Sequence, residues 1–150
     1  MDTIRFTKEG HKKLVQEMED LKVERPGVIA DVQKARELGD LKENGYYQAS
    51  KAKLRQIDSR LMHIKYYLKV GEIVADTKNG AVTIGSVVTM ANGDKEMTYA
   101  FVGDLEADPS QKKLSLLSPI GRAVEGKVVG ETFAVDLPAG KVTYTVKKVS

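Results

Sequence analysis

Two carboxylates, Asp40 and Glu43, stand three residues apart in the stretch ARELGDLKENGYY, which covers residues 35–47. Residues spaced in this way around a helix start can share one face, so that both carboxylates point in the same direction. Paired carboxylate oxygens suit Mg²⁺, which keeps several waters and takes only one or two protein carboxylates. The spacing therefore makes Asp40 and Glu43 candidate magnesium ligands, in a site that a partner would have to complete.

The same two acids could instead serve the start of a helix. If a first helix ends near Leu38, with Gly39 as its left-handed cap, Asp40 opens the next helix and Glu43 follows three residues later. This arrangement is close to a capping box, and negative charge is favourable at a helix N-terminus. Capping is the commoner use of such a pattern, and the spacing alone leaves both interpretations open.

Heptad patterns on either side of this stretch predict the elements that position it. The first pattern is Leu14, Met18, Leu21, Val28, Val32, Ala35, with Arg25 at its skipped position; the second is Tyr47, Ser50, Leu54, Ile57, Leu61, Ile64, Leu68. Two such helices joined by a few residues must lie antiparallel. Thr7 is the expected N-cap of the first helix, and Pro26 should kink or locally break it. Residues 1–76 are therefore predicted to form a coiled-coil hairpin domain with an acidic tip.

After Gly71 the chain changes to short runs rich in β-branched residues: AVTIGSVVTM, EMTYAFVG, KKLSLLS, ETFAVDL and KVTYTVKKV. Asn92-Gly93 is a hairpin-turn signal, and residues 138–140 predict a second turn. Ser118 and Pro119 suit the N-cap and first position of a short helix. Residues 77–150 are therefore predicted to form a second domain, a small antiparallel sheet with one short helix, which makes the fold class α+β.

Composition narrows the function classes. The chain has 150 residues, 41% of them hydrophobic and 30% charged, which is typical of a soluble globular protein. Since there is no apolar run of about 20 residues and no signal-peptide core, we expect a cytoplasmic protein without a membrane partner. The absence of cysteine excludes a disulfide framework and a cysteine-based zinc site. The two histidines lie far apart, outside any metal-ligand spacing.

Charge is distributed unevenly, although the net charge is only +3. Between residues 46 and 70 the only acid is Asp58, whereas the basic residues there are Lys51, Lys53, Arg55, Arg60, Lys65 and Lys69. A locally basic helix indicates a nearby polyanion, and a solvated helix face is the alternative.

Four features together resemble the bacterial Gre transcript-cleavage factors: the heptad hairpin containing Pro26, GDLKEN at 39–44, VGDLEAD at 102–108 and SPIGRAVEGKVVGE at 118–131. The resemblance covers nearly the whole chain. It implies that the hairpin enters the secondary channel of bacterial RNA polymerase and that an FKBP-like second domain docks outside it. The polymerase, not this chain, would then cut backtracked RNA near its 3′ end. The resemblance implies no cofactor in the free protein, a Mg²⁺ shared with the polymerase active site, and a monomer.

The same resemblance assigns roles to residues in matching positions. Asp40 and Glu43 would be the catalytic, metal-assisting pair, supported at the tip by Asn44 and Tyr47. The remaining matches are Arg36, Lys51, Lys53 and Arg55, near RNA or the channel, and Ser118, Pro119 and Ile120, at the polymerase docking surface. One departure is Tyr46, where the family usually carries an acid; another is Gly45, where Ala is common.

Three other functions remain open alternatives. A channel binder of the same architecture could inhibit polymerase without stimulating cleavage; the acid pair argues against it, whereas Tyr46 favours it. A prolyl isomerase needs an apolar pocket lined by aromatic side chains, and the few aromatics of the second half are mostly expected in its core: Tyr99, Phe101, Phe133 and Tyr144. A purely structural coiled-coil adaptor would tolerate neutralisation of Asp40 and Glu43.

Overall fold

The computed structural model describes residues 3–39, 44–74 and 79–150. The chain divides into two compact units. The hairpin unit comprises residues 12–70, and the sheet unit comprises residues 1–11 together with 71–150. The domain boundary predicted between residues 76 and 77 lies outside the described residues.

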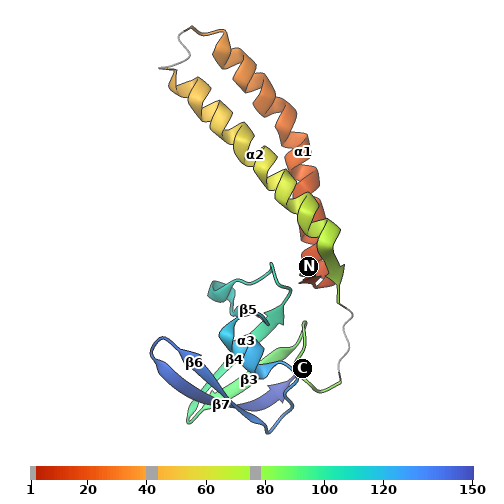
Figure 1. Cartoon of the computed structure of the whole chain (residues 1–150), viewed down its shortest axis with the longest axis vertical. Helices are drawn as coiled ribbons and strands as arrows, with labels where there is room; N and C mark the ends of the chain where they lie inside the picture. The colour runs from red at the N-terminus through yellow and green to blue at the C-terminus, as the bar shows by residue number, and fades with distance from the viewer. Residues whose placement is uncertain (1–2, 40–43, 75–78) are drawn as a thin grey trace. The chain divides into compact units, whose positions relative to one another are not determined.

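The hairpin unit consists of two helices, α1 (Lys8–Arg36) and α2 (Gly45–Val70), which run side by side in opposite directions (Figure 1). The first residues of α1, up to His11, belong to the sheet unit. Their shared core is built from predicted heptad positions: Val28, Val32, Ala35, Tyr47, Ile57 and Leu61 are buried, and Met18, Leu21 and Leu54 pack against them. Each fully buried side chain of this size contributes about 1.5–3 kcal/mol. The predicted antiparallel hairpin is therefore confirmed.

The N-terminal end of α1 follows the sequence signal, whereas Pro26 in its middle does not break the helix. Thr7 caps the helix as predicted, because its carbonyl accepts the His11 N–H at 3.0 Å and its hydroxyl accepts the Gly10 N–H at 3.0 Å. The helix continues through Pro26, so of the two predicted effects the local break is wrong and the kink stays a prediction. Proline removes only one backbone donor, and the adjacent Arg25 is bonded to Asp58 of α2 at 2.6 Å, which helps hold this turn.

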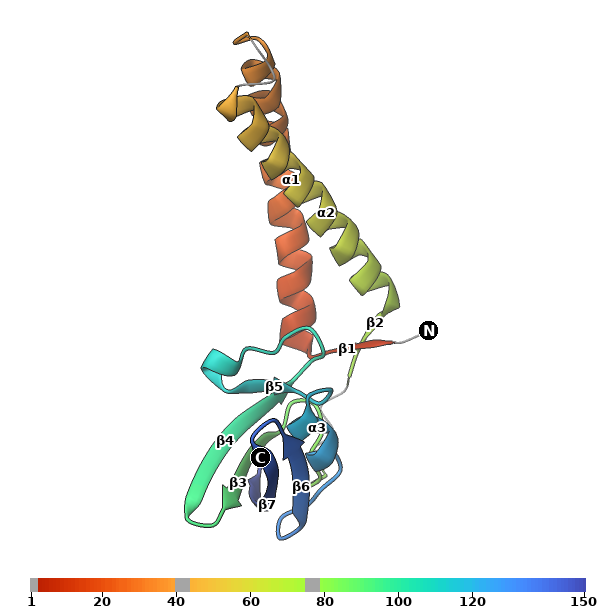
Figure 2. The same cartoon turned by 60° about the vertical axis from the view of Figure 1, so that its left-hand side comes forward.

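The sheet unit contains a five-stranded sheet in the order β5-β4-β3-β7-β6 (Figure 2). Its strands are β3 (Val87–Asn92), β4 (Lys95–Val102), β5 (Lys113–Ser115), β6 (Thr132–Leu137) and β7 (Gly140–Val149). All neighbours are antiparallel except β4 and β5, which are parallel, so the sheet is mixed where an antiparallel one was predicted. The chain between β4 and β5 passes through the 3₁₀ turn Pro109–Gln111, which lets it return in the same direction. The α+β class is confirmed.

Both predicted turns are present. Asn92 pairs with Lys95 around Gly93, which has φ +62°, and Leu137 pairs with Gly140. The first β-branched run is only partly a strand, because β3 starts at Val87 and Gly85, with φ +93°, interrupts the pattern before it. Val82 and Ile84 are nevertheless buried, so this part of the run supplies core residues without pairing as a strand.

Two further strands were not predicted. β1 (Ile4–Phe6) pairs in parallel with β2 (Gly71–Ile73).

The short helix α3 (Pro119–Val124) begins as predicted, with Ser118 as its N-cap. The sheet unit's buried core is Val82, Ile84, Val88, Met90, Phe101, Leu116, Val124, Phe133, Val135, Tyr144 and Val146. Among the described residues, neither long helix carries an apolar stretch that could span a bilayer.

Candidate functional site at the hairpin tip

The predicted acid pair, Asp40 and Glu43, lies outside the described residues. The structure does define the two helix ends that flank this segment, because α1 ends at Arg36 and α2 begins at Gly45. Among the described residues no group of three or more His, Cys, Asp or Glu side chains could hold a metal ion.

Asn44 joins these two helix ends. Its side-chain Oδ1 accepts the Tyr47 N–H at 3.1 Å and its backbone carbonyl accepts the Gln48 N–H at 3.0 Å, which makes Asn44 the N-cap of α2. Its Nδ2 also donates to the carbonyl of Ala35, in the last turn of α1, at 3.0 Å. The prediction that Asp40 opens the second helix is therefore wrong. The Asn44 amide supplies both an acceptor for the cap and a donor for the facing carbonyl, whereas an ionised carboxylate such as that of Asp40 only accepts.

Tyr47 brings two of the predicted cations together. Its side chain is only 8% exposed. A hydrogen bond from Arg36 lowers the pKa of the Tyr47 phenol, partial desolvation opposes this shift, and the charge of Lys51 reinforces it. Lys51 Nζ lies 4.7 Å from the centre of the Tyr47 ring. We call Arg36, Asn44, Tyr47 and Lys51 the tip-base cluster; all four were named as site residues from the sequence.

Tyr46, the departure from the family pattern, has a partner that the sequence analysis missed. Desolvation and the neighbouring carboxylate of Asp31, which accepts a hydrogen bond from the Tyr46 hydroxyl, raise the pKa of this phenol. The backbone carbonyl of Tyr46 accepts the Ser50 hydroxyl at 2.8 Å. The Tyr46 residue is nonetheless 45% exposed.

The contact between Asp31 and Tyr46 continues a row of side-chain pairs between α1 and α2. We call this row the ladder; its pairs are Glu17–Arg60, Glu24–Lys53 and Asp31–Tyr46. Glu17 bonds Arg60 at 2.5 Å and Glu24 bonds Lys53 at 3.0 Å, so that partners recur every seven residues on each helix. A hydrogen bond from Arg60 lowers the pKa of Glu17. Exposed pairs of this kind contribute at most about 1 kcal/mol each. The heptad spacing of the acids was the signal that could have revealed Asp31.

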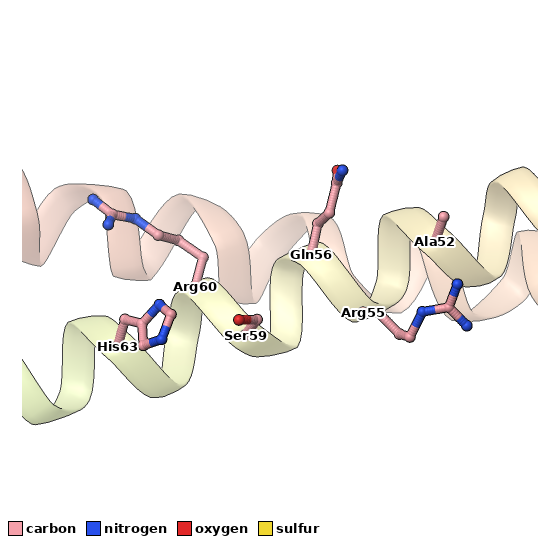
Figure 3. A pocket seen from close by; sticks show the side chains of 6 residues that line it. All are labelled: Ala52, Arg55, Gln56, Ser59, Arg60 and His63. Carbon is pink, nitrogen blue, oxygen red and sulfur yellow. The ribbon is translucent and has the colours of Figure 1, made fainter.

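The ladder changes the interpretation of the basic helix. Lys53 and Arg60 are already paired with acids of α1, whereas Arg55 makes no ion pair with any described residue. Figure 3 shows Arg60 reaching toward α1 and Arg55 pointing away from it. Both line an open groove on α2 with Ala52, Gln56, Ser59 and His63. Lys51 and Arg55 are therefore better placed than Lys53 to meet an external anion.

The predicted docking residues differ in exposure. Ser118 Oγ accepts the Gly121 N–H at 3.1 Å and donates to the Ser115 carbonyl at 2.6 Å, so it holds the start of α3. Ile120 is half-buried against the sheet unit's core. Pro119 is exposed, and Leu117 beside it is 51% exposed. Any partner would thus meet Pro119 and Leu117 rather than Ser118.

The VGDLEAD segment, which had no assigned role, holds the N-terminal strand. Thr7 donates its N–H to Glu106 Oε2 at 2.8 Å and its hydroxyl to Glu106 Oε1. Arg5 and Asp104 exchange bonds at 2.8 Å, from the Arg5 N–H to Asp104 Oδ2 and from the Asp104 N–H to the Arg5 carbonyl. A Cβ atom at Gly10 or Gly103 would lie 1.9 Å from the Glu106 carboxyl group. We call these contacts of Glu106 with Thr7, Gly10 and Gly103 the Glu106 clamp.

Comparisons with known proteins agree across the whole chain. Residues 4–73 match the family described as transcription elongation factor, N-terminal, and residues 77–150 match transcription elongation factor, GreA/GreB, C-term. The chain is 42% identical over 154 residues to transcription elongation factor GreA of Hyphomonas neptunium, covering 99% of this chain and 98% of that protein. It is 38% identical over 151 residues to GreA of Neorickettsia sennetsu, covering 97% and 95%. It is also similar to the solved structure of GreA factor homolog 1 (Gfh1) of Thermus thermophilus, with a TM-score of 0.48, 24% identity and 99% of each chain covered. The chain belongs to the GreA/GreB family of transcription elongation factors.

Proposed function

We propose that this chain binds bacterial RNA polymerase, inserts its hairpin tip into the secondary channel and stimulates the polymerase's own cleavage of backtracked RNA. The observation that carries the proposal is the cap of α2. Because Asn44 supplies both the cap and the tie to Ala35, capping of α2 does not explain why Asp40 and Glu43 are there. Membership of the GreA/GreB family supports the same function.

In this proposal Asp40 and Glu43 would hold a Mg²⁺ shared with the polymerase active site. The donor set fits such a role, because two carboxylates leave most of an octahedral shell to waters and to the partner. When bound, the ion lowers the pKa of a coordinated water and neutralises charge in the phosphodiester transition state. The chain's own contribution is positioning, which can be worth about 7–11 kcal/mol when the geometry is right. By itself the protein is then not an enzyme.

The tip-base cluster would support this tip and offer positive charge to the RNA or to the channel wall. Arg36 and Lys51, which lie on either side of the acid-bearing segment in the sequence, meet at the Tyr47 side chain. Asn44 keeps the two helix ends together through its bond to Ala35. A cationic group held in this way attracts phosphate without needing to recognise a base.

Neutralising Lys51 and Arg55 together should weaken binding to a stalled elongation complex several-fold and flatten its salt dependence. The matched control is Lys65→Gln with Lys69→Gln, which removes the same charge from exposed positions farther along α2. Affinity is measured by titration at several salt concentrations. Equal effects from the two double variants would reduce the role of these cations to net charge alone.

We further propose that the sheet unit docks on polymerase at the segment Ser118–Ile120. Because Ser118 and Ile120 hold α3 in place, the contact falls on Pro119 and its exposed neighbour Leu117. Pro119→Glu should then weaken polymerase binding about tenfold or more, while the helix cap and the thermal stability persist. Unchanged affinity of this variant would place the docking surface elsewhere.

The experiment that tests the proposed function is RNA cleavage in a stalled, backtracked bacterial elongation complex, with and without this protein. We expect the protein to stimulate cleavage only when polymerase and Mg²⁺ are both present. Cleavage of free RNA by the purified protein would contradict the proposal. Binding that slows the polymerase without cutting RNA would instead identify a channel inhibitor.

A further inference from the structure

Tyr46 presents an exposed aromatic ring beside the tip. It is the second residue of α2 and stands three residues after Glu43 in the sequence. Desolvation and the neighbouring Asp31 of α1 raise the pKa of its phenol, and its backbone carbonyl accepts the Ser50 hydroxyl in the next turn. The backbone of Tyr46 is therefore held in α2, whereas 45% of the residue's surface remains exposed.

The ladder between the helices does not by itself call for an aromatic side chain. At its other two positions α2 offers cations, Lys53 and Arg60, to acids of α1. A lysine or glutamine at position 46 could also donate a hydrogen bond to Asp31. Tyrosine adds a flat apolar surface with few rotatable bonds, which is suited to contact at low entropic cost. An exposed ring at this place offers a flat face on which a ligand with a flat face could stack.

We propose that the Tyr46 ring stacks on a base of single-stranded RNA close to its 3′ end. This inference rests on the proposed function, which brings backtracked RNA to the tip. Stacking on an aromatic side chain is the main way in which proteins hold unpaired bases. The tip-base cluster supplies the complementary charge, since Arg36 and Lys51 provide two cations on the same end of the hairpin. The ring would hold the base while these cations attract the backbone.

Two variants separate stacking from a role in the ladder. Tyr46→Phe keeps the ring and removes the hydroxyl that could donate to Asp31, whereas Tyr46→Gln keeps a donor for Asp31 and removes the ring. Each is tested in stalled complexes whose backtracked RNA carries a purine, a pyrimidine or an abasic nucleotide at successive positions from the 3′ end. The readouts are the factor concentration that gives half-maximal cleavage and the melting temperature of the free protein.

If Tyr46 stacks on a base, one RNA position should show at least about a fivefold preference for a purine over an abasic nucleotide. Tyr46→Phe should retain this preference and Tyr46→Gln should abolish it. The reverse order, or equal preference in both variants and the wild type, would overturn the inference and leave Tyr46 as part of the ladder. Absence of any stimulation of cleavage by the wild-type protein would instead refute the proposed function, so the two failures are distinguishable.

Discussion

Asp40→Asn and Glu43→Gln should each lower cleavage stimulation by at least tenfold, which corresponds to about 1.4 kcal/mol of barrier. Each substitution removes a negative charge, and Mg²⁺ strongly prefers carboxylate oxygen. Stability should hardly change, because Asn44 and not Asp40 is the N-cap of α2. At most a few tenths to about 1 kcal/mol of interaction with the helix dipole would be lost. Cleavage stimulation should therefore fall in both variants while their thermal stability stays nearly unchanged.

The measurement is single-turnover cleavage in a stalled complex at saturating factor, beside thermal unfolding of each variant. Glu37→Gln is the matched control, because Glu37 is an exposed acid directly after α1. It changes the charge near the tip by the same amount without touching the pair. Wild-type rates from both well-folded test variants would exclude the catalytic role of Asp40 and Glu43. An equal loss in Glu37→Gln would assign the effect to charge alone.

Much of the hairpin could be predicted from the sequence because its contact face is set by local periodicity. A heptad pattern brings Val28 and Val32 to one stripe of α1, whatever lies opposite. The two patterns of residues 14–35 and 47–68 therefore predicted the buried positions of both helices. Pro26 shows the limit of local rules, because the helix accommodates one missing donor.

The pairing between the two helices could not be predicted in the same way. The contact of Asp31 with Tyr46 depends on the register of α1 against α2, and a heptad pattern permits several registers that differ by whole turns. The cap shows a related limit. Asp40 and Asn44 are equally good capping residues, and only the start of α2 at Gly45 selects Asn44.

Contacts between distant parts of the chain were the hardest to predict. β1 and β2 have three residues each and are separated by the whole hairpin, so neither carries a strand pattern of useful length. The bond between Thr7 and Glu106 spans 99 positions of the sequence. The sequence around Glu106 was recognisable as a motif, but its role depends on Gly10 of α1 and on Gly103 directly after β4.

The Glu106 clamp should be one of the largest single contributors to the stability of the sheet unit. Glu106→Ala removes a charged acceptor and leaves the half-buried Thr7 N–H without its partner. Hydrogen bonds to charged groups are worth about 1.5–3 kcal/mol, and an unsatisfied buried donor adds a penalty of similar size. We expect a loss of about 3 kcal/mol in the free energy of opening, measured by hydrogen exchange of the Asp104 amide, whose acceptor is the Arg5 carbonyl. The control variant is Glu72→Ala, which removes an exposed acid from β2 and should change the free energy of opening little.

Gly10→Ala provides a test of the same clamp in which the sign of the effect reverses. In the wild-type protein the new Cβ would lie 1.9 Å from the Glu106 carboxyl carbon, so the carboxylate must move and its bonds to Thr7 weaken. All three nearest atoms to that Cβ belong to Glu106. In the Glu106→Ala background the obstacle is gone, and alanine in a helix is favoured over glycine by about 0.5–1 kcal/mol. The same substitution should therefore lower the opening free energy of the wild type by at least about 1 kcal/mol and raise that of the variant. Destabilisation of equal size in both backgrounds would mean that the glycine serves the helix backbone and not the clamp.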